Sequence, residues 1–146
     1  MDKFIEFFYY LVYDAETANY YWHNDSVECC MRNGFYTLLA CAFLTTMFFY
    51  FYWSNVKIFE HATLKSWFLN GLTGMGITFV ASEIVVAYFS QLEGSEAYIG
   101  QSGCDILVFC LYNATVGFAI MFTLMSTLVQ LLSKNAKNIP WHFYKV

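Results

Sequence analysis

Three long apolar runs separate the polar parts of this chain. They cover residues 34–53, 65–89 and 106–132, and nearly all of their residues are uncharged. About 20 helical residues, at ~1.5 Å per residue, cross the ~30 Å hydrocarbon layer of a bilayer. The pattern therefore predicts an all-α integral membrane protein in which three transmembrane helices form an antiparallel bundle.

The polar segments on either side of the runs are short. Within the N-terminal segment 1–33, residues 3–13 are almost continuously apolar and aromatic but too few to span a bilayer. Aromatic side chains favour the membrane interface, so we expect an interfacial or protein-docked helix there, and a second short helix after Asp14. The organisation expected is thus an N-terminal surface segment, a bundle over 34–132, and a basic and aromatic tail over 133–146.

The basic residues favour one orientation in the membrane. Five of the seven lie between the first two runs or after the third: Lys57, Lys65, Lys134, Lys137 and Lys145. Acidic residues dominate the N-terminal segment and the connection between the second and third runs. Because basic residues are retained on the cytoplasmic or matrix side, we expect the N-terminus outside and the C-terminus inside. A bacterial inner membrane or a mitochondrial inner membrane fits this prediction.

The second run contains a stripe of small residues. Gly74, Thr78 and Ser82 recur at intervals of four, and Gly71 precedes them. Such a stripe lets another helix backbone approach closely, which is a common packing surface in membranes. The partner is another span of this chain or a second copy of it, and the sequence leaves both open.

One ionisable residue, Glu83, lies deep within a predicted span. A carboxyl at that depth needs a partner or a proton, and intramembrane carboxylates often mark ion pathways. Asn113 falls at a similar depth in the third span, so we predict an intramembrane polar pair of Glu83 and Asn113. A structural contact and a role in ion handling are both open.

Aromatic residues make up 22% of the chain, and several gather at the predicted inner ends of the spans. The ones singled out as an interface are Trp53, Trp67, Trp141, Phe143 and Tyr144. Rings at this level anchor a protein to lipid or contact further subunits. Lipid anchoring requires only the bilayer around these rings, whereas subunit contact requires further proteins in the membrane.

Five cysteines raise the question of a disulfide or a metal site. The topology places Cys29, Cys30 and Cys104 at the outer surface, so a bridge from Cys104 to Cys29 or Cys30 is a candidate, with free thiols as the alternative. The spacing matches no zinc pattern. The three histidines are far apart in the expected topology, and no metal site is predicted.

No catalytic or nucleotide-binding motif is present, so we expect neither an enzyme nor a cofactor. The net charge of −4 and the absence of basic patches argue against nucleic acid. The expected function is a scaffold or anchor subunit of a larger assembly, such as a trans-envelope secretion machine or a respiratory complex. Its partners are then the lipid bilayer and other membrane subunits or copies of itself. The alternative is a homo-oligomeric ion channel or ion-conducting stator subunit in which Glu83 lines a pore.

Overall fold

The computed structural model describes residues 2–12, 25–52, 63–92, 104–132 and 139–140. Every regular element in these ranges is helical. Three helical stretches are long and apolar enough to cross a membrane: Glu28–Tyr52, Leu64–Phe89 and Leu107–Leu132. The described residues of the three apolar runs are therefore helical, and the first helix begins before the run that predicted it.

Each long stretch is assembled from one or more helical segments. The first consists of α3 (Asp25–Met47) and the π-helical η1 (Phe48–Tyr52), and the second is α4 (Leu64–Leu92). The third consists of α6 (Cys104–Tyr112), the π-helical η3 (Asn113–Gly117), α7 (Phe118–Val129) and the 3₁₀ turn η4 (Gln130–Leu132). A short helix, α1 (Asp2–Val12), comes before them.

The start of α4 is fixed by a reciprocal cap. The backbone N–H of Ser66 donates to Thr63 Oγ1 at 3.1 Å, and the backbone N–H of Thr63 donates to Ser66 Oγ at 3.0 Å. Two donors that the first helical turn leaves without partners are thereby satisfied. The apolar run therefore has a defined beginning.

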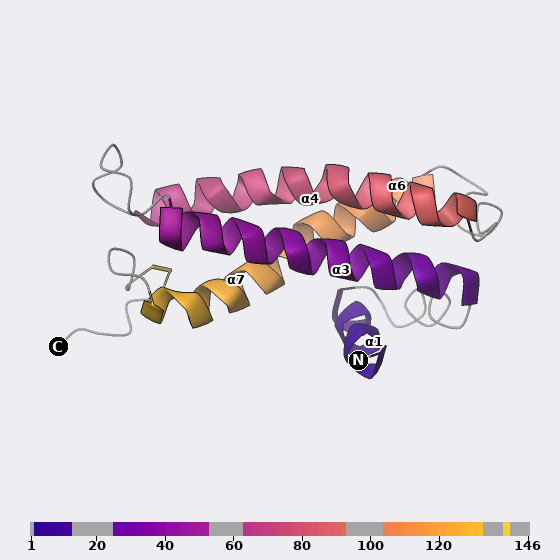
Figure 1. Ribbon diagram of the computed structural model, residues 1–146, viewed down its shortest axis with the longest axis horizontal. Helices are drawn as coiled ribbons and strands as arrows, with labels where there is room; N and C mark the ends of the chain where they lie inside the picture. The colour runs from indigo at the N-terminus through magenta and orange to yellow at the C-terminus, as the bar shows by residue number, and fades with distance from the viewer. Residues whose placement is uncertain (1, 13–24, 53–62, 93–103, 133–138, 141–146) are drawn as a thin grey trace.

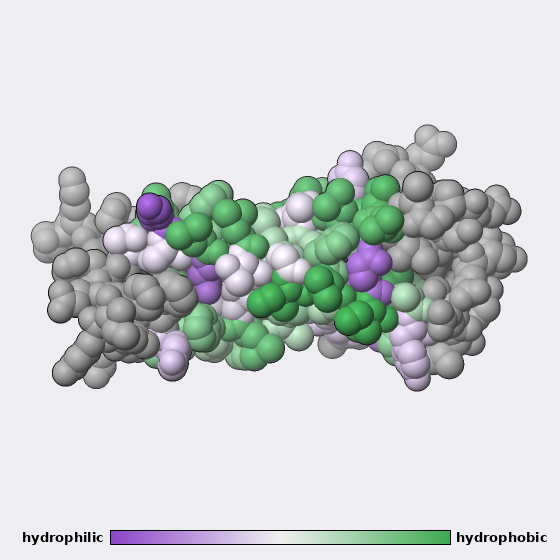
Figure 2. All heavy atoms as spheres, turned by 90° about the horizontal axis from the view of Figure 1, so that it is seen from above, coloured by the Kyte–Doolittle hydropathy of each residue, from purple (hydrophilic) through white to green (hydrophobic). Residues whose placement is uncertain are grey.

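Helices α3 and α4 lie side by side along the long axis of the molecule, while α6 adjoins α4 and α7 adjoins α3 (Figure 1). The contacts fix how they run. Gly34 of α3 and Ser82 of α4 both meet Asn113, whereas Thr45 of α3 meets Asn70 of α4. Residue numbers therefore rise along α3 as they fall along α4. The face seen in Figure 2 is mainly hydrophobic, and its most hydrophilic side chains lie toward the two ends of the described part.

Aromatic rings fill the space between α4 and the third stretch. Trp67 stacks on Phe122 with ring centroids 5.0 Å apart, and Phe122 stacks on Phe118 at 5.5 Å. The glycines of α4 leave room for these rings, because a Cβ added at Gly71 would lie 3.0 Å from Phe122 and one at Gly74 only 2.4 Å from Phe118. Stacked rings against a glycine surface thus hold α7 on α4.

At the C-terminal end of the first stretch, η1 packs against Ile139, which follows the third stretch in the sequence. Tyr50 is buried, and its hydroxyl donates to the carbonyl oxygen of Ile139 at 2.5 Å. Ile139 packs with Phe49 and Tyr50 in a small cluster. The chain after η4 therefore returns to the end of η1.

Helix α1 runs across the bundle rather than along it, beside α3 (Figure 1). Its residues Ile5, Phe8, Tyr9 and Val12 are buried. The Tyr9 hydroxyl donates to the Met31 carbonyl oxygen at 2.7 Å. The helix expected over 3–13 is confirmed as far as Val12, where the described part ends, and it is docked on the protein. The second short helix expected after Asp14 falls outside the described residues.

Candidate functional site: a polar cluster and an open groove

The buried amide of Asn113 joins all three long stretches. Asn113 begins the π-helical η3 and is fully buried. Its Nδ2 donates to the carbonyl oxygen of Gly34 at 3.0 Å and to Ser82 Oγ at 3.3 Å. The carbonyl of Gly34 accepts only, so it fixes which end of the amide faces it. A π-helical turn at a buried polar residue is a frequent feature of functional sites.

Glu83 also belongs to this cluster, through its sequence neighbour Ser82 and through the thiol of Cys110. The amide of Asn113 bonds to Ser82, the residue before Glu83, while the thiol of Cys110 lies next to the Glu83 carboxyl. In the described part of the chain, Glu83 Oε1 and Asn113 Oδ1 are buried and accept no hydrogen bond. These two acceptor oxygens thus have no hydrogen bond there, and a weak donor, the thiol of Cys110, lies beside the Glu83 carboxyl. Glu83 and Asn113 thus belong to the same cluster, but the Asn113 amide donates to Gly34 and Ser82 and not to the Glu83 carboxyl.

The stripe of small residues faces the interior of the bundle. Gly71 and Gly74 pack on aromatic rings of α7, while Thr78 and Ser82 are fully buried. The Thr78 hydroxyl donates to the Gly74 carbonyl oxygen at 2.8 Å, so it leaves no polar group exposed on the packed face. Of the two partners that the sequence left open, the structure places another span of the same chain against this stripe.

Trp67 also turns inward. Its indole N–H donates to Ser126 Oγ at 3.0 Å, and its ring covers Phe122. The indole is therefore committed to contacts within the chain, although the side chain is only half-buried. The other four residues predicted as an interface, Trp53, Trp141, Phe143 and Tyr144, lie outside the described residues.

The candidate disulfide remains a prediction. Cys29 is half-buried and Cys30 is buried on α3, whereas the side chain of Cys104 is not among those described. Asn33 Nδ2 donates to the carbonyl oxygen of Cys29 at 2.8 Å. Across the described ranges, no three His, Cys, Asp or Glu side chains come together in a way that would hold a metal ion. All three histidines lie outside those ranges.

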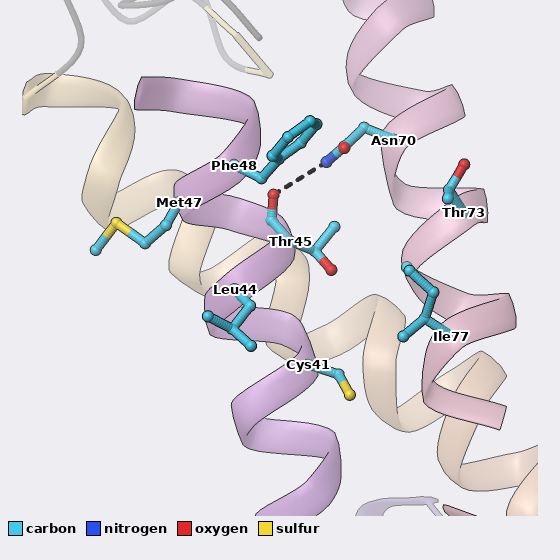
Figure 3. A pocket seen from close by; sticks show the side chains of 9 residues that line it. Cys41, Leu44, Thr45, Met47, Phe48, Asn70, Thr73 and Ile77 are labelled. Atoms are coloured by element: carbon cyan, nitrogen blue, oxygen red, sulfur yellow. Dashed lines mark hydrogen bonds between the residues drawn. The ribbon is translucent and has the colours of Figure 1, made fainter. Parts of the chain in front are cut away.

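An open groove of about 620 Å³ lies between α3 and α4 (Figure 3). Its lining residues come after Gly34 on α3 and before Ser82 on α4, the two residues that bind Asn113. Leu44 and Cys41 of α3 and Ile77 of α4 border it, and its lining is almost entirely apolar. At one end Asn70 Nδ2 donates to the carbonyl oxygen of Thr45 at 3.1 Å, close to where α3 becomes π-helical.

Asn70 was not among the residues that the sequence singled out. It is 9% exposed and stands inside the second apolar run. An amide in a run of apolar residues is the signal that would have found it, because such a group needs a hydrogen-bond partner in an apolar surrounding. The same reasoning applies to Gln130, which is also buried.

The outward face of α4 contains one glycine with open space around it. A Cβ added at Gly76 would meet nothing within 4 Å. Leu72, Ile77 and Val80 surround Gly76 and are about half exposed. Gly76 therefore forms a notch in an apolar surface that borders the groove.

Comparisons with protein-family models, curated proteins and solved structures found no match to this chain.

Proposed function

We propose that this chain is a multi-pass integral membrane protein and serves as a scaffold or anchor subunit of a larger membrane assembly. Three helices of sufficient length and apolarity support insertion as an antiparallel bundle. The distribution of basic residues supports an N-terminus outside and a C-terminus in the cytoplasm or matrix. A trans-envelope secretion machine and a respiratory complex are the proposed hosts, in a bacterial or mitochondrial inner membrane. No catalytic role is part of the proposal.

The outward face of α4 is the observation that carries this proposal. Only 22% of the apolar stretch of α4 is buried, against 39% for the first stretch and 44% for the third. The face contains the Gly76 notch and borders the open groove. In a membrane, helices associate where small residues allow close backbone approach. We infer that a helix of another subunit, or of a second copy, packs along this face.

Gly76→Leu tests this proposal without disturbing the packing of the bundle. Its side chain would fill the notch and hold a partner helix away, while the free space around Gly76 leaves the chain itself intact. Thr115→Leu is the matched control, because Thr115 is also a small exposed residue within a long apolar helix, but on the third stretch. Each variant is purified from its native membrane in mild detergent, and its composition is measured by native mass spectrometry.

The expected result is that the wild type and Thr115→Leu retain associated subunits, whereas Gly76→Leu loses them and keeps its helical circular dichroism spectrum. Retention of every subunit by Gly76→Leu would refute docking on this face. A wild type that is purified alone and monomeric would refute the scaffold proposal itself.

The second candidate function is an oligomeric ion channel or stator subunit. The observation that favours it is the pair of buried oxygens, Glu83 Oε1 and Asn113 Oδ1, that accept no hydrogen bond within the described part. Such oxygens are groups that bind a proton or a cation along a pathway. Ion flux in reconstituted vesicles, measured for the wild type and for Glu83→Gln, separates the candidates. Flux that Glu83→Gln abolishes supports the channel, and the absence of flux in both proteins removes it.

A further inference from the structure

Helix α1 presents two different strips outside the face formed by its buried residues, and one member of these strips, Phe4, also touches the ring of Phe35 in α3 at a centroid distance of 6.0 Å. With about 100° of rotation per residue, Glu6, Tyr10 and Lys3 follow one another around the helix and form a polar strip. The next positions around the helix, Phe7, Leu11 and Phe4, form an apolar strip and are all more than half exposed. The polar strip begins beside Tyr9, and the apolar strip ends beside Phe8.

The way α1 is docked orients these strips along the bundle. Tyr9 contacts Met31 through its hydroxyl and Phe109 through its ring, at a centroid distance of 5.9 Å. Met31 lies in the first part of α3, and Phe109 lies near the beginning of the third stretch. The ring of Phe8 instead lies 3.4 Å from a Cβ built on Gly117, and Gly117 is about 12 Å further along the third stretch than Phe109. The polar strip therefore lies toward the end of the bundle where α3 and the third stretch begin, and the apolar strip lies toward the middle of the bundle.

A second charged group lies at the same level as the polar strip. Arg32 and Glu28 form an ion pair one turn apart on α3, and both side chains are partly exposed. Arg32 neighbours Met31, the residue that accepts the Tyr9 hydrogen bond. Charges from two different helices thus gather at one end of the bundle, while the surface beyond α1 is apolar.

From this arrangement we infer that α1 is an interfacial helix that marks one boundary of the hydrocarbon layer. Its apolar strip contacts phospholipid acyl chains, and its polar strip lies among the headgroups. The boundary falls near Gly34, beyond the Glu28–Arg32 pair. At ~1.5 Å per residue the helix from Gly34 to Tyr52 is about 27 Å long, which agrees with a hydrocarbon thickness of about 30 Å. The inference rests on the membrane insertion proposed above.

Lysine labelling in lipid nanodiscs tests this placement. The wild type, Leu11→Lys and Tyr10→Lys are reconstituted in phosphatidylcholine nanodiscs and treated with a water-soluble acylating ester that does not enter the bilayer. Peptide mass spectrometry then gives the acylation rate at each lysine. Native Lys3 is the internal standard in all three proteins, and Tyr10→Lys is the matched control for introducing a lysine into α1.

Lys3 and the lysine introduced at position 10 should react at similar rates, whereas the lysine introduced at position 11 should react at least about tenfold more slowly. If Leu11→Lys instead releases α1 from the bundle, hydrogen exchange over residues 2–12 rises in that variant and stays unchanged in Tyr10→Lys. That result also supports the inference, because a charge is then tolerated only on the polar strip.

Two results would overturn the placement of α1. One is equal reactivity at positions 3 and 11 with unchanged hydrogen exchange, which would put the apolar strip in water. The other is an unreactive Lys3, which would bury the polar strip. A chain that alkaline carbonate extracts from its native membrane would instead overturn membrane insertion, so the two failures are distinguishable.

Discussion

Two glycines two residues apart on α4 should respond in opposite ways to the same added methyl group. Gly74→Ala places a Cβ 2.4 Å from Phe118 Cζ and 2.8 Å from two side-chain atoms of Thr45. Gly76→Ala places the same atom in open space. Both substitutions occur in the interior of one helix, so they gain the same intrinsic helix propensity.

The difference in stability between the two variants therefore isolates the clash. Replacing glycine with alanine in a helix stabilises it by about 0.5–1 kcal/mol. An extra carbon in a well-packed core costs about 1–3 kcal/mol. Gly76→Ala should thus be more stable than the wild type, and Gly74→Ala should be less stable than Gly76→Ala by about 1–3 kcal/mol. That difference is roughly 5- to 150-fold in the unfolding equilibrium constant.

Unfolding in mixed micelles with increasing sodium dodecyl sulfate, followed by circular dichroism, measures this difference. Gly74→Leu extends the series, since a larger side chain on the packed face should separate α4 from α7 altogether. A Gly74→Ala variant at least as stable as Gly76→Ala would show that the ring of Phe118 does not depend on the glycine at position 74. The account of the α4 packing given above would then be wrong.

Three further substitutions each remove one hydrogen-bonding side chain, and the same unfolding assay measures the effect. Asn113→Leu removes both bonds of the buried amide and should cost about 0.5–2 kcal/mol, and an unchanged midpoint would count against its bridging role. Trp67→Phe keeps a ring in place but loses the bond to Ser126, so a loss of about 0.5–1.5 kcal/mol is expected. Burial raises the pKa of Tyr9 well above its ordinary value. The undocked phenol ionises near pH 10, so docking of α1 is fully stable below about pH 10 and weakens as the pH rises above it. Tyr9→Phe should lose the bond to Met31 and also this pH dependence, and a slope that persists would assign it to another group.

The helical architecture was accessible from the sequence because it depends on length and composition. The apolar runs are long enough to span a membrane whatever surrounds them, and their helices appear as predicted. The four-residue recurrence of Gly74, Thr78 and Ser82 also defines a face of α4 without any knowledge of the partner. The structure adds that this face lies inside the bundle, against the third stretch.

The hydrogen bonds of the polar cluster were not accessible in the same way. Similar depth in two neighbouring spans suggested that Asn113 pairs with Glu83, but depth says nothing of rotation about the helix axis. The amide of Asn113 donates instead to Gly34 and Ser82. Trp67 shows the same limit, since membrane depth predicted an interface and its indole instead reaches Ser126.

The π-helical turn of η3 lets the third stretch contain one residue more than an α-helix of the same rotation. A π-helical turn is equivalent to one residue inserted into an α-helix. Five π-helical residues turn about as far as four α-helical ones, roughly 400°, so deleting the exposed Val116 would return the segment to α-helical geometry with the residues after it in nearly the same rotational phase. Phe118 would then keep its place against Gly74, and Ser126 its place beside Trp67. The extra residue is thus accommodated locally, in the turn that begins with Asn113, and leaves the rotational phase of the stacked rings unchanged.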